Sequence, residues 1–143
     1  MAESTVEWLR AFAFLLVLLP ALVANLRSGL VTNAHNAMIF LVGVAILVTE
    51  RLLSEPSMSL PWGLWTTVIL LVIVLASLGT VPGGVAKLLI ALLPWFTGWE
   101  SYLFTATAGF FFSAAWGYAK GGQAPLIPAF YLAGLGAFIY AAA

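Results

Sequence analysis

The sequence contains no cysteine and no aspartate, and charged residues make up only 7% of its 143 residues. The absence of cysteine excludes disulfides, thiolate metal sites and thiol nucleophiles. A single histidine, His35, cannot form a histidine-rich metal site. The formal net charge is zero, so the chain lacks the basic field that attracts nucleic acid. We therefore expect no cofactor, no metal ion and no nucleic-acid partner.

Hydrophobic residues are abundant instead, at 64% of the chain, with a mean hydropathy of +1.12. A soluble domain of this length needs more charge to cover its surface, so the composition predicts an integral membrane protein in contact with lipid. A helix needs about 20 apolar residues to cross the hydrocarbon. Six stretches are candidates, the fourth being short: about 8–24, 37–53, 62–78, 85–96, 102–118 and 126–142.

These stretches predict an all-α fold, a six-helix integral membrane bundle that forms a single domain over residues 1–143. A signal peptide is an alternative interpretation of the first stretch. Its apolar run is long, however, and it continues past Pro20, which favours a helix of the mature protein.

The cations suggest an orientation, because cytoplasmic loops of membrane proteins are enriched in lysine and arginine. With the N-terminus outside, Arg27, Lys87 and Lys120 lie on the cytoplasmic side, and Arg10 and Arg51 lie outside with all the glutamates. The reverse orientation places fewer cations inside. Tryptophans then gather at the outer level, where we expect them to anchor the helices in the interface: Trp8, Trp62, Trp65, Trp95 and Trp99.

Small residues recur every four positions in the last two predicted helices. In the fifth they are Thr105, Gly109, Ser113 and Gly117, and in the sixth Ala129, Ala133, Ala137 and Ala141. Ridges of small residues let helix backbones approach closely in lipid. We expect these ridges to pack helices of the same chain rather than another subunit.

Two polar stretches at helix ends resemble the motifs of a known family. They are Asn25-Leu26-Arg27-Ser28-Gly29-Leu30-Val31-Thr32-Asn33 and Pro82-Gly83-Gly84-Val85-Ala86-Lys87-Leu88. They resemble the two catalytic motifs of the type IV prepilin peptidases, especially the short form of Tad-type pilus systems, which read roughly D-L-R-T-x-x-I-P-N and G-x-G-D-x-K-L. The stretches "ALLPWFTGWE" and "APLIPAFYLAGL" also resemble parts of this family. The resemblance implies a six-helix membrane aspartyl protease fold.

The catalytic aspartates of this family fall on Asn25 and Val85. Such a protease needs two carboxyls, one to take a proton from the attacking water and one to polarise the scissile carbonyl. Asparagine is not a useful base, valine has no polar side-chain atom, and the chain has no aspartate elsewhere. Pro82 and Thr32 also replace motif residues. The departures therefore predict that no residue of this chain is catalytic.

The remaining motif positions are candidates for residual binding: Arg27, Asn33, Gly83, Gly84 and Lys87. Lys87 has two interpretations, either a side chain that extends to the interface for solvation or a cation that binds an acidic group. We expect Asn25 to cap the loop that follows the first helix, Asn33 to cap the second helix, and His35 to lie at its start in the interface.

The leading hypothesis is a catalytically inactive prepilin-peptidase-like protein of a prokaryotic inner membrane, acting as a scaffold or accessory subunit of a complex with other membrane proteins. One alternative is a prepilin peptidase of a Tad or type IV pilus system, an aspartic endopeptidase whose acids come from a second chain. Another is a module that binds a prepilin without cleaving it. A transporter is disfavoured, because no charged residue marks a pathway at mid-membrane.

Overall fold

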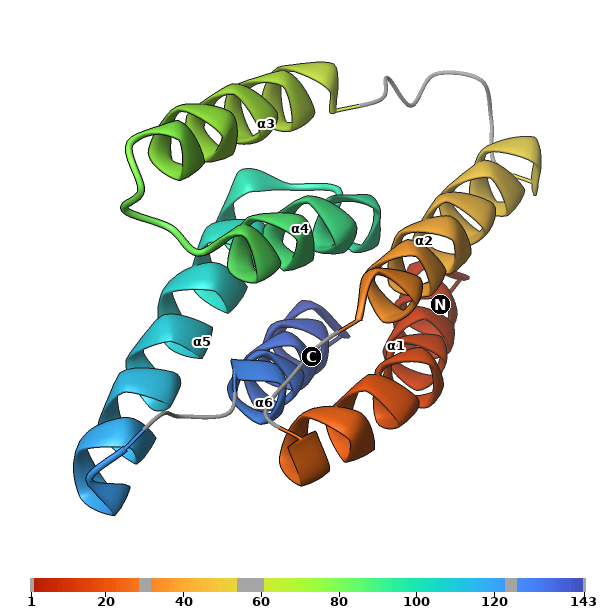
Figure 1. Ribbon diagram of the computed structural model, residues 1–143. Helices are drawn as coiled ribbons and strands as arrows, with labels where there is room; N and C mark the ends of the chain where they lie inside the picture. The colour runs from red at the N-terminus through yellow and green to blue at the C-terminus, as the bar shows by residue number, and fades with distance from the viewer. Residues whose placement is uncertain (1, 29–31, 54–60, 123–125, 143) are drawn as a thin grey trace. The chain divides into compact units, whose positions relative to one another are not determined.

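The computed structural model describes residues 2–28, 32–53, 61–122 and 126–142, and every regular element within these ranges is a helix (Figure 1). The elements are α1 (Ala2–Ser28), α2 (Asn33–Leu53), α3 (Trp62–Ser77), α4 (Gly83–Leu92), the short 3-10 helix η1 (Leu93–Trp95), α5 (Trp99–Lys120) and α6 (Leu126–Ala142). Each predicted stretch overlaps one α-helix, and the fourth also includes η1. The all-α class is therefore confirmed for the described residues.

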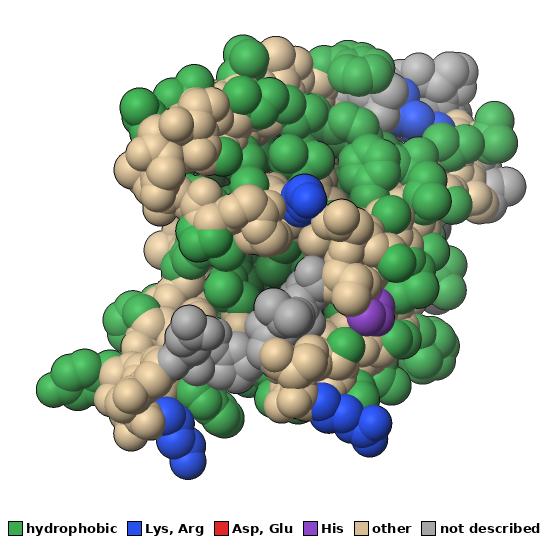
Figure 2. All heavy atoms as spheres, viewed as in Figure 1, with side chains coloured by type: hydrophobic (Ala, Val, Ile, Leu, Met, Phe, Trp, Pro, Cys, Tyr) green, Lys and Arg blue, Asp and Glu red, His purple; other side chains and the backbone are tan. Residues whose placement is uncertain are grey.

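Two segments in the described part of the chain are long and apolar enough to cross a membrane, Glu7–Ser28 within α1 and Asn33–Leu52 within α2. Three further apolar helices are shorter: Trp62–Ser77, Gly83–Trp95 and Leu126–Ala141. Hydrophobic side chains also cover large areas of the surface (Figure 2). Leu52, for example, is 81% exposed and Phe111 is 69% exposed. Exposed apolar area on this scale is typical of a surface that contacts lipid or another protein.

The chain divides into two compact units. The first contains α1, α6 and α5 from Glu100 onward, and the second contains α2, α3, α4 and η1. The single domain expected over residues 1–143 stays a prediction.

In the first unit, α1 and α6 pack side by side (Figure 1). Five buried positions of α1 recur every three or four residues, as one face of a helix requires: Ala11, Phe14, Leu18, Ala21 and Asn25. Arg10, next to Ala11, is buried as well. A Cβ atom at Gly134 would lie 2.5 Å from the Phe14 ring, so only glycine leaves room for this ring against α6. The Phe14 ring also meets that of Phe138 edge-on, with centroids 5.3 Å apart.

The predicted small-residue ridge of α5 is buried at Thr105, Gly109 and Ser113. A Cβ at Gly109 would lie 2.9 Å from three atoms of the Phe130 ring in α6, so the aromatic ring rests directly on the α5 backbone. Phe110 contacts the same ring edge-on, with centroids 5.3 Å apart. The ridge thus packs within the chain, as expected, and Phe130 fills the space that it leaves.

In the second unit, α4 packs against both α2 and α3, and η1 packs against α2. Trp95 of η1 is 1% exposed, and its indole N–H donates a hydrogen bond of 2.9 Å to the Ile39 carbonyl. A Cβ at Gly43 would lie 2.7 Å from the indole nitrogen. Trp95 is therefore a core residue of this unit, because α2 supplies both the space and the acceptor that its ring needs. Its expected position at the outer membrane level stays a prediction.

Candidate functional site

The α4 helix begins at the motif glycines. Pro82 precedes it in an extended conformation, with φ −58° and ψ 141°, and its carbonyl accepts the Ala86 N–H at 3.0 Å. Gly83 and Gly84 form the start of the first turn, and a Cβ added at either would meet no atom within 4 Å. The positive-φ glycines of the described chain are Gly79 and Gly121. Gly83 and Gly84 are not among them, so the backbone and the neighbouring atoms would accept a larger side chain at both positions.

Lys87 lies one turn further along α4, on its exposed face. The Nζ of Lys87 donates a hydrogen bond of 2.9 Å to Oδ1 of Asn33, the first residue of α2. The other residues around it are buried, namely Val85, Ala86, Leu88 and Leu89. Lys87 thus lies on the exposed face of α4, where a charged side chain can interrupt the apolar run. Its hydrogen bond with Asn33 joins two of the residues that the sequence predicted for residual binding.

A groove of about 410 Å³ runs between α2 and α4 at this point. Its polar residues are Asn33, Asn36 and Lys87, and its apolar residues are Ala37, Phe40, Ile90 and Ala91. The Asn36 side chain is buried, at 6% exposure, and neither its amide nitrogen nor its amide oxygen has a hydrogen-bond partner among the described residues. Leaving such a group unpaired typically costs about 1–3 kcal/mol. This amide is the most unusual polar group of the groove.

The sequence interpretation missed Asn36, although a signal for its burial exists. Asn36 precedes Ile39, Gly43 and Leu47 at spacings of three and four residues, and all four positions are buried. A polar residue in register with the apolar face of a helix marks either a hydrogen-bonded core position or a binding position.

Asn25 is buried near the end of α1, with 4% of its surface exposed. Its Oδ1 accepts the backbone N–H of Ile127, the second residue of α6, at 3.2 Å. The first N–H groups of a helix have no partner within the helix, so this amide caps α6 from another element. The loop-capping role expected for Asn25 stays a prediction, because part of that loop lies outside the described residues. Arg27, two residues later, is exposed in the last turn of α1, and residues 29–31 of the motif lie outside the described residues.

Val85, the other position at which the resemblance implies a catalytic aspartate, is 9% exposed in α4. Asn25 and Val85 belong to different units. Their expected approach stays a prediction.

The start of α2 is capped by Thr32 rather than by Asn33. The Thr32 hydroxyl oxygen accepts the backbone N–H of His35 at 3.3 Å, and the Thr32 carbonyl accepts that of Asn36 at 3.2 Å. The same hydroxyl lies 2.9 Å from Nδ1 of His35. The residue before α2 thus satisfies its first N–H groups, which leaves the Asn33 side chain available to Lys87.

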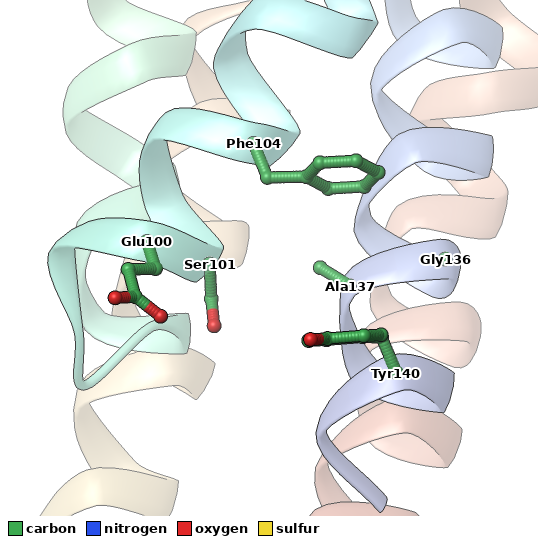
Figure 3. Close-up of a pocket in the computed structure, with 6 residues that line it drawn as sticks. All are labelled: Glu100, Ser101, Phe104, Gly136, Ala137 and Tyr140. Carbon is green, nitrogen blue, oxygen red and sulfur yellow. The ribbon is translucent and has the colours of Figure 1, made fainter. Parts of the chain in front are cut away.

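A second hollow, of about 560 Å³, lies between the start of α5 and the end of α6 (Figure 3). Its lining is Glu100, Ser101, Phe104, Gly136, Ala137 and Tyr140. Phe104 and Tyr140 extend into the space from opposite helices. Glu100 and Tyr140 are both exposed, and Tyr140 retains 86% of its accessible surface. Among its described lining residues the hollow therefore has no buried polar side chain that indicates a particular ligand.

Comparisons with known proteins give no family assignment. No protein-family model matches the chain, and no curated protein or solved structure is significantly similar to it.

Proposed function

We propose that the protein is a catalytically inactive relative of the prepilin peptidases that serves as a scaffold or accessory subunit in a membrane complex. In this proposal the helices form a six-helix, multi-pass bundle in a prokaryotic inner membrane. Two segments long and apolar enough to span a membrane, within α1 and α2, support this placement, as does the 64% hydrophobic composition.

The main support for the proposal is the side-chain chemistry at Asn25 and Val85. Asn25 offers an amide in place of a carboxylate, and its oxygen is already engaged by the Ile127 N–H. Val85 offers only a buried hydrocarbon side chain. A pair of carboxyls that exchange protons with water cannot be assembled from these two groups. What these positions contribute is packing and helix capping, which favours an architectural role.

The hydrogen bond between Lys87 and Asn33 supports the resemblance itself. These residues lie 54 positions apart, one in each motif, and both match the family pattern. Their side chains meet at 2.9 Å within one unit. Contact between two matched residues is expected if both motifs derive from one ancestral site.

The membrane placement is tested by cysteine accessibility, because the natural chain has no cysteine. Single substitutions Ser28→Cys and Gly122→Cys place thiols near the ends of α1 and α5. In intact cells a membrane-impermeant reagent should label neither thiol, and it should label both after the cells are opened. Labelling from outside in intact cells contradicts the proposed topology, and recovery of the chain in the soluble fraction contradicts the membrane placement.

The subunit role is tested by purification of the tagged chain from native membranes after mild cross-linking. We expect a stoichiometric membrane-protein partner. Recovery of an uncut prepilin as the main partner would support the binding module instead. A chain that purifies alone at its own mass, with and without the cross-linker, contradicts the proposal.

A further inference from the structure

The groove between α2 and α4 combines a cation, a buried unpaired amide and apolar walls. Lys87 is its charged lining residue, and no described acid lines it. Asn36 is more than nine-tenths buried and lacks a hydrogen-bond partner in the described chain. Because a buried unpaired amide is costly, a groove that contains one is well suited to a ligand with hydrogen-bonding atoms.

Polar and apolar residues are arranged in the same order on both helices. Along α2 the lining runs from Asn33 and Asn36 to Phe40, and along α4 it runs from Lys87 to Ile90. The hydrogen bond from Lys87 to Asn33 brings the two polar ends together. The groove therefore has a polar, positively charged end near the starts of both helices and an apolar continuation between them.

We infer that this groove binds one anionic phospholipid. The phosphate contacts Lys87 and, once the shielded Asn36 side chain turns toward the groove, the amide of Asn36, and an acyl chain lies along Phe40 and Ile90. Charge complementarity favours an anionic headgroup, and the apolar continuation favours a ligand with a hydrocarbon chain over a free anion. This inference rests on the membrane placement proposed above, since α2 is one of the two candidate spanning helices.

The test is native mass spectrometry of the purified chain in mixed micelles that contain equal amounts of phosphatidylglycerol and phosphatidylethanolamine. We expect the wild-type chain to retain one phosphatidylglycerol in preference. The Lys87→Gln variant should lose this preference, with retention falling about tenfold, equivalent to about 1.4 kcal/mol. The matched control is Lys120→Gln, which removes an exposed cation in the last turn of α5, outside the groove, and should retain the lipid normally.

A second variant separates binding from folding. Asn36→Leu removes the unpaired amide while keeping a side chain of similar size. It should lower phosphatidylglycerol retention without lowering stability in lipid-free detergent, because it removes a buried polar group that has no partner there. If this variant is more stable but retains the lipid fully, Asn36 is not a lipid contact and the inference is wrong.

Other results overturn the inference directly. Equal retention of both lipids by the wild-type chain, or equal phosphatidylglycerol retention by the wild-type chain and Lys87→Gln, excludes the site. So does a mass that shows a second copy or a peptide bound in place of lipid. None of these results bears on the inactive-subunit role, because the measurement uses the purified chain alone. A chain found in the soluble fraction removes the membrane placement and this inference together.

Discussion

The cap that Asn25 provides to α6 leads to a quantitative prediction. Its Oδ1 accepts the Ile127 N–H at 3.2 Å, and its side chain is 4% exposed. In Asn25→Ala that N–H loses its acceptor in a place from which water is excluded. Loss of a buried hydrogen bond that leaves one partner unpaired costs about 1–3 kcal/mol, and loss of a helix cap costs about 0.5–2 kcal/mol. The two figures describe the same bond, so we expect a total loss of about 1–3 kcal/mol.

The assay is unfolding of the purified protein in mixed micelles, with the free energy of unfolding taken from the denaturing-detergent titration. Asn33→Ala is the matched control, because it removes the same amide from an exposed site whose partner, Lys87, remains solvated. We expect this control to cost less than about 1 kcal/mol. An equal loss of stability in Asn25→Ala and Asn33→Ala would refute the capping role.

Asn25→Asp refines the test, because its carboxylate keeps an acceptor oxygen next to the first turn of α6. Negative charge at a helix N-terminus contributes about 0.3–1 kcal/mol, but burial of the carboxylate opposes this gain. The stability of this variant should therefore lie between those of the wild-type chain and Asn25→Ala. A variant less stable than Asn25→Ala would mean that the cost of burying the charge exceeds the value of the cap.

Two further substitutions test the packing. Gly134→Ala places a Cβ 2.5 Å from the Phe14 ring and should destabilise the first unit by about 1–3 kcal/mol, whereas Gly136→Ala, whose Cβ would lie 3.8 Å from its nearest neighbour, should be tolerated. Equal stability of these two alanine variants in the same titration would contradict the close contact. Trp95→Phe removes the indole N–H that donates to the Ile39 carbonyl and should cost at least about 1 kcal/mol. An unchanged free energy of unfolding would place Trp95 outside the core.

The helices could be predicted from the sequence because each is an apolar run bounded by polar or turn-forming residues. The α5 ridge was also visible, since Thr105, Gly109 and Ser113 recur at helical spacing and all three are buried. The residue that packs against that ridge could not be predicted from the sequence. Nothing in the local sequence indicates that Phe130 is the ring that covers Gly109, because the contact depends on how two helices meet.

The same limit applies to the contacts of Trp95 and Asn25. Tryptophan near a helix end is typical of a membrane interface, but Trp95 is buried because Gly43 and the Ile39 carbonyl accommodate its indole ring. The sequence did not indicate that Asn25 would accept the N–H of Ile127, which lies 102 residues away. Both roles depend on distant residues.

The most direct test of the proposed function is a cleavage assay with the purified chain, free of host peptidase, and a tagged prepilin, with an authentic prepilin peptidase as the positive control. We predict no mobility shift of the prepilin, because general acid and general base catalysis each contribute about 10² to 10⁴ in rate and neither position supplies a carboxyl. The triple variant Asn25→Asp, Val85→Asp, Pro82→Gly tests whether a carboxyl pair at these two positions supplies that chemistry. Robust cleavage by the unmodified chain would contradict the proposal that it is inactive.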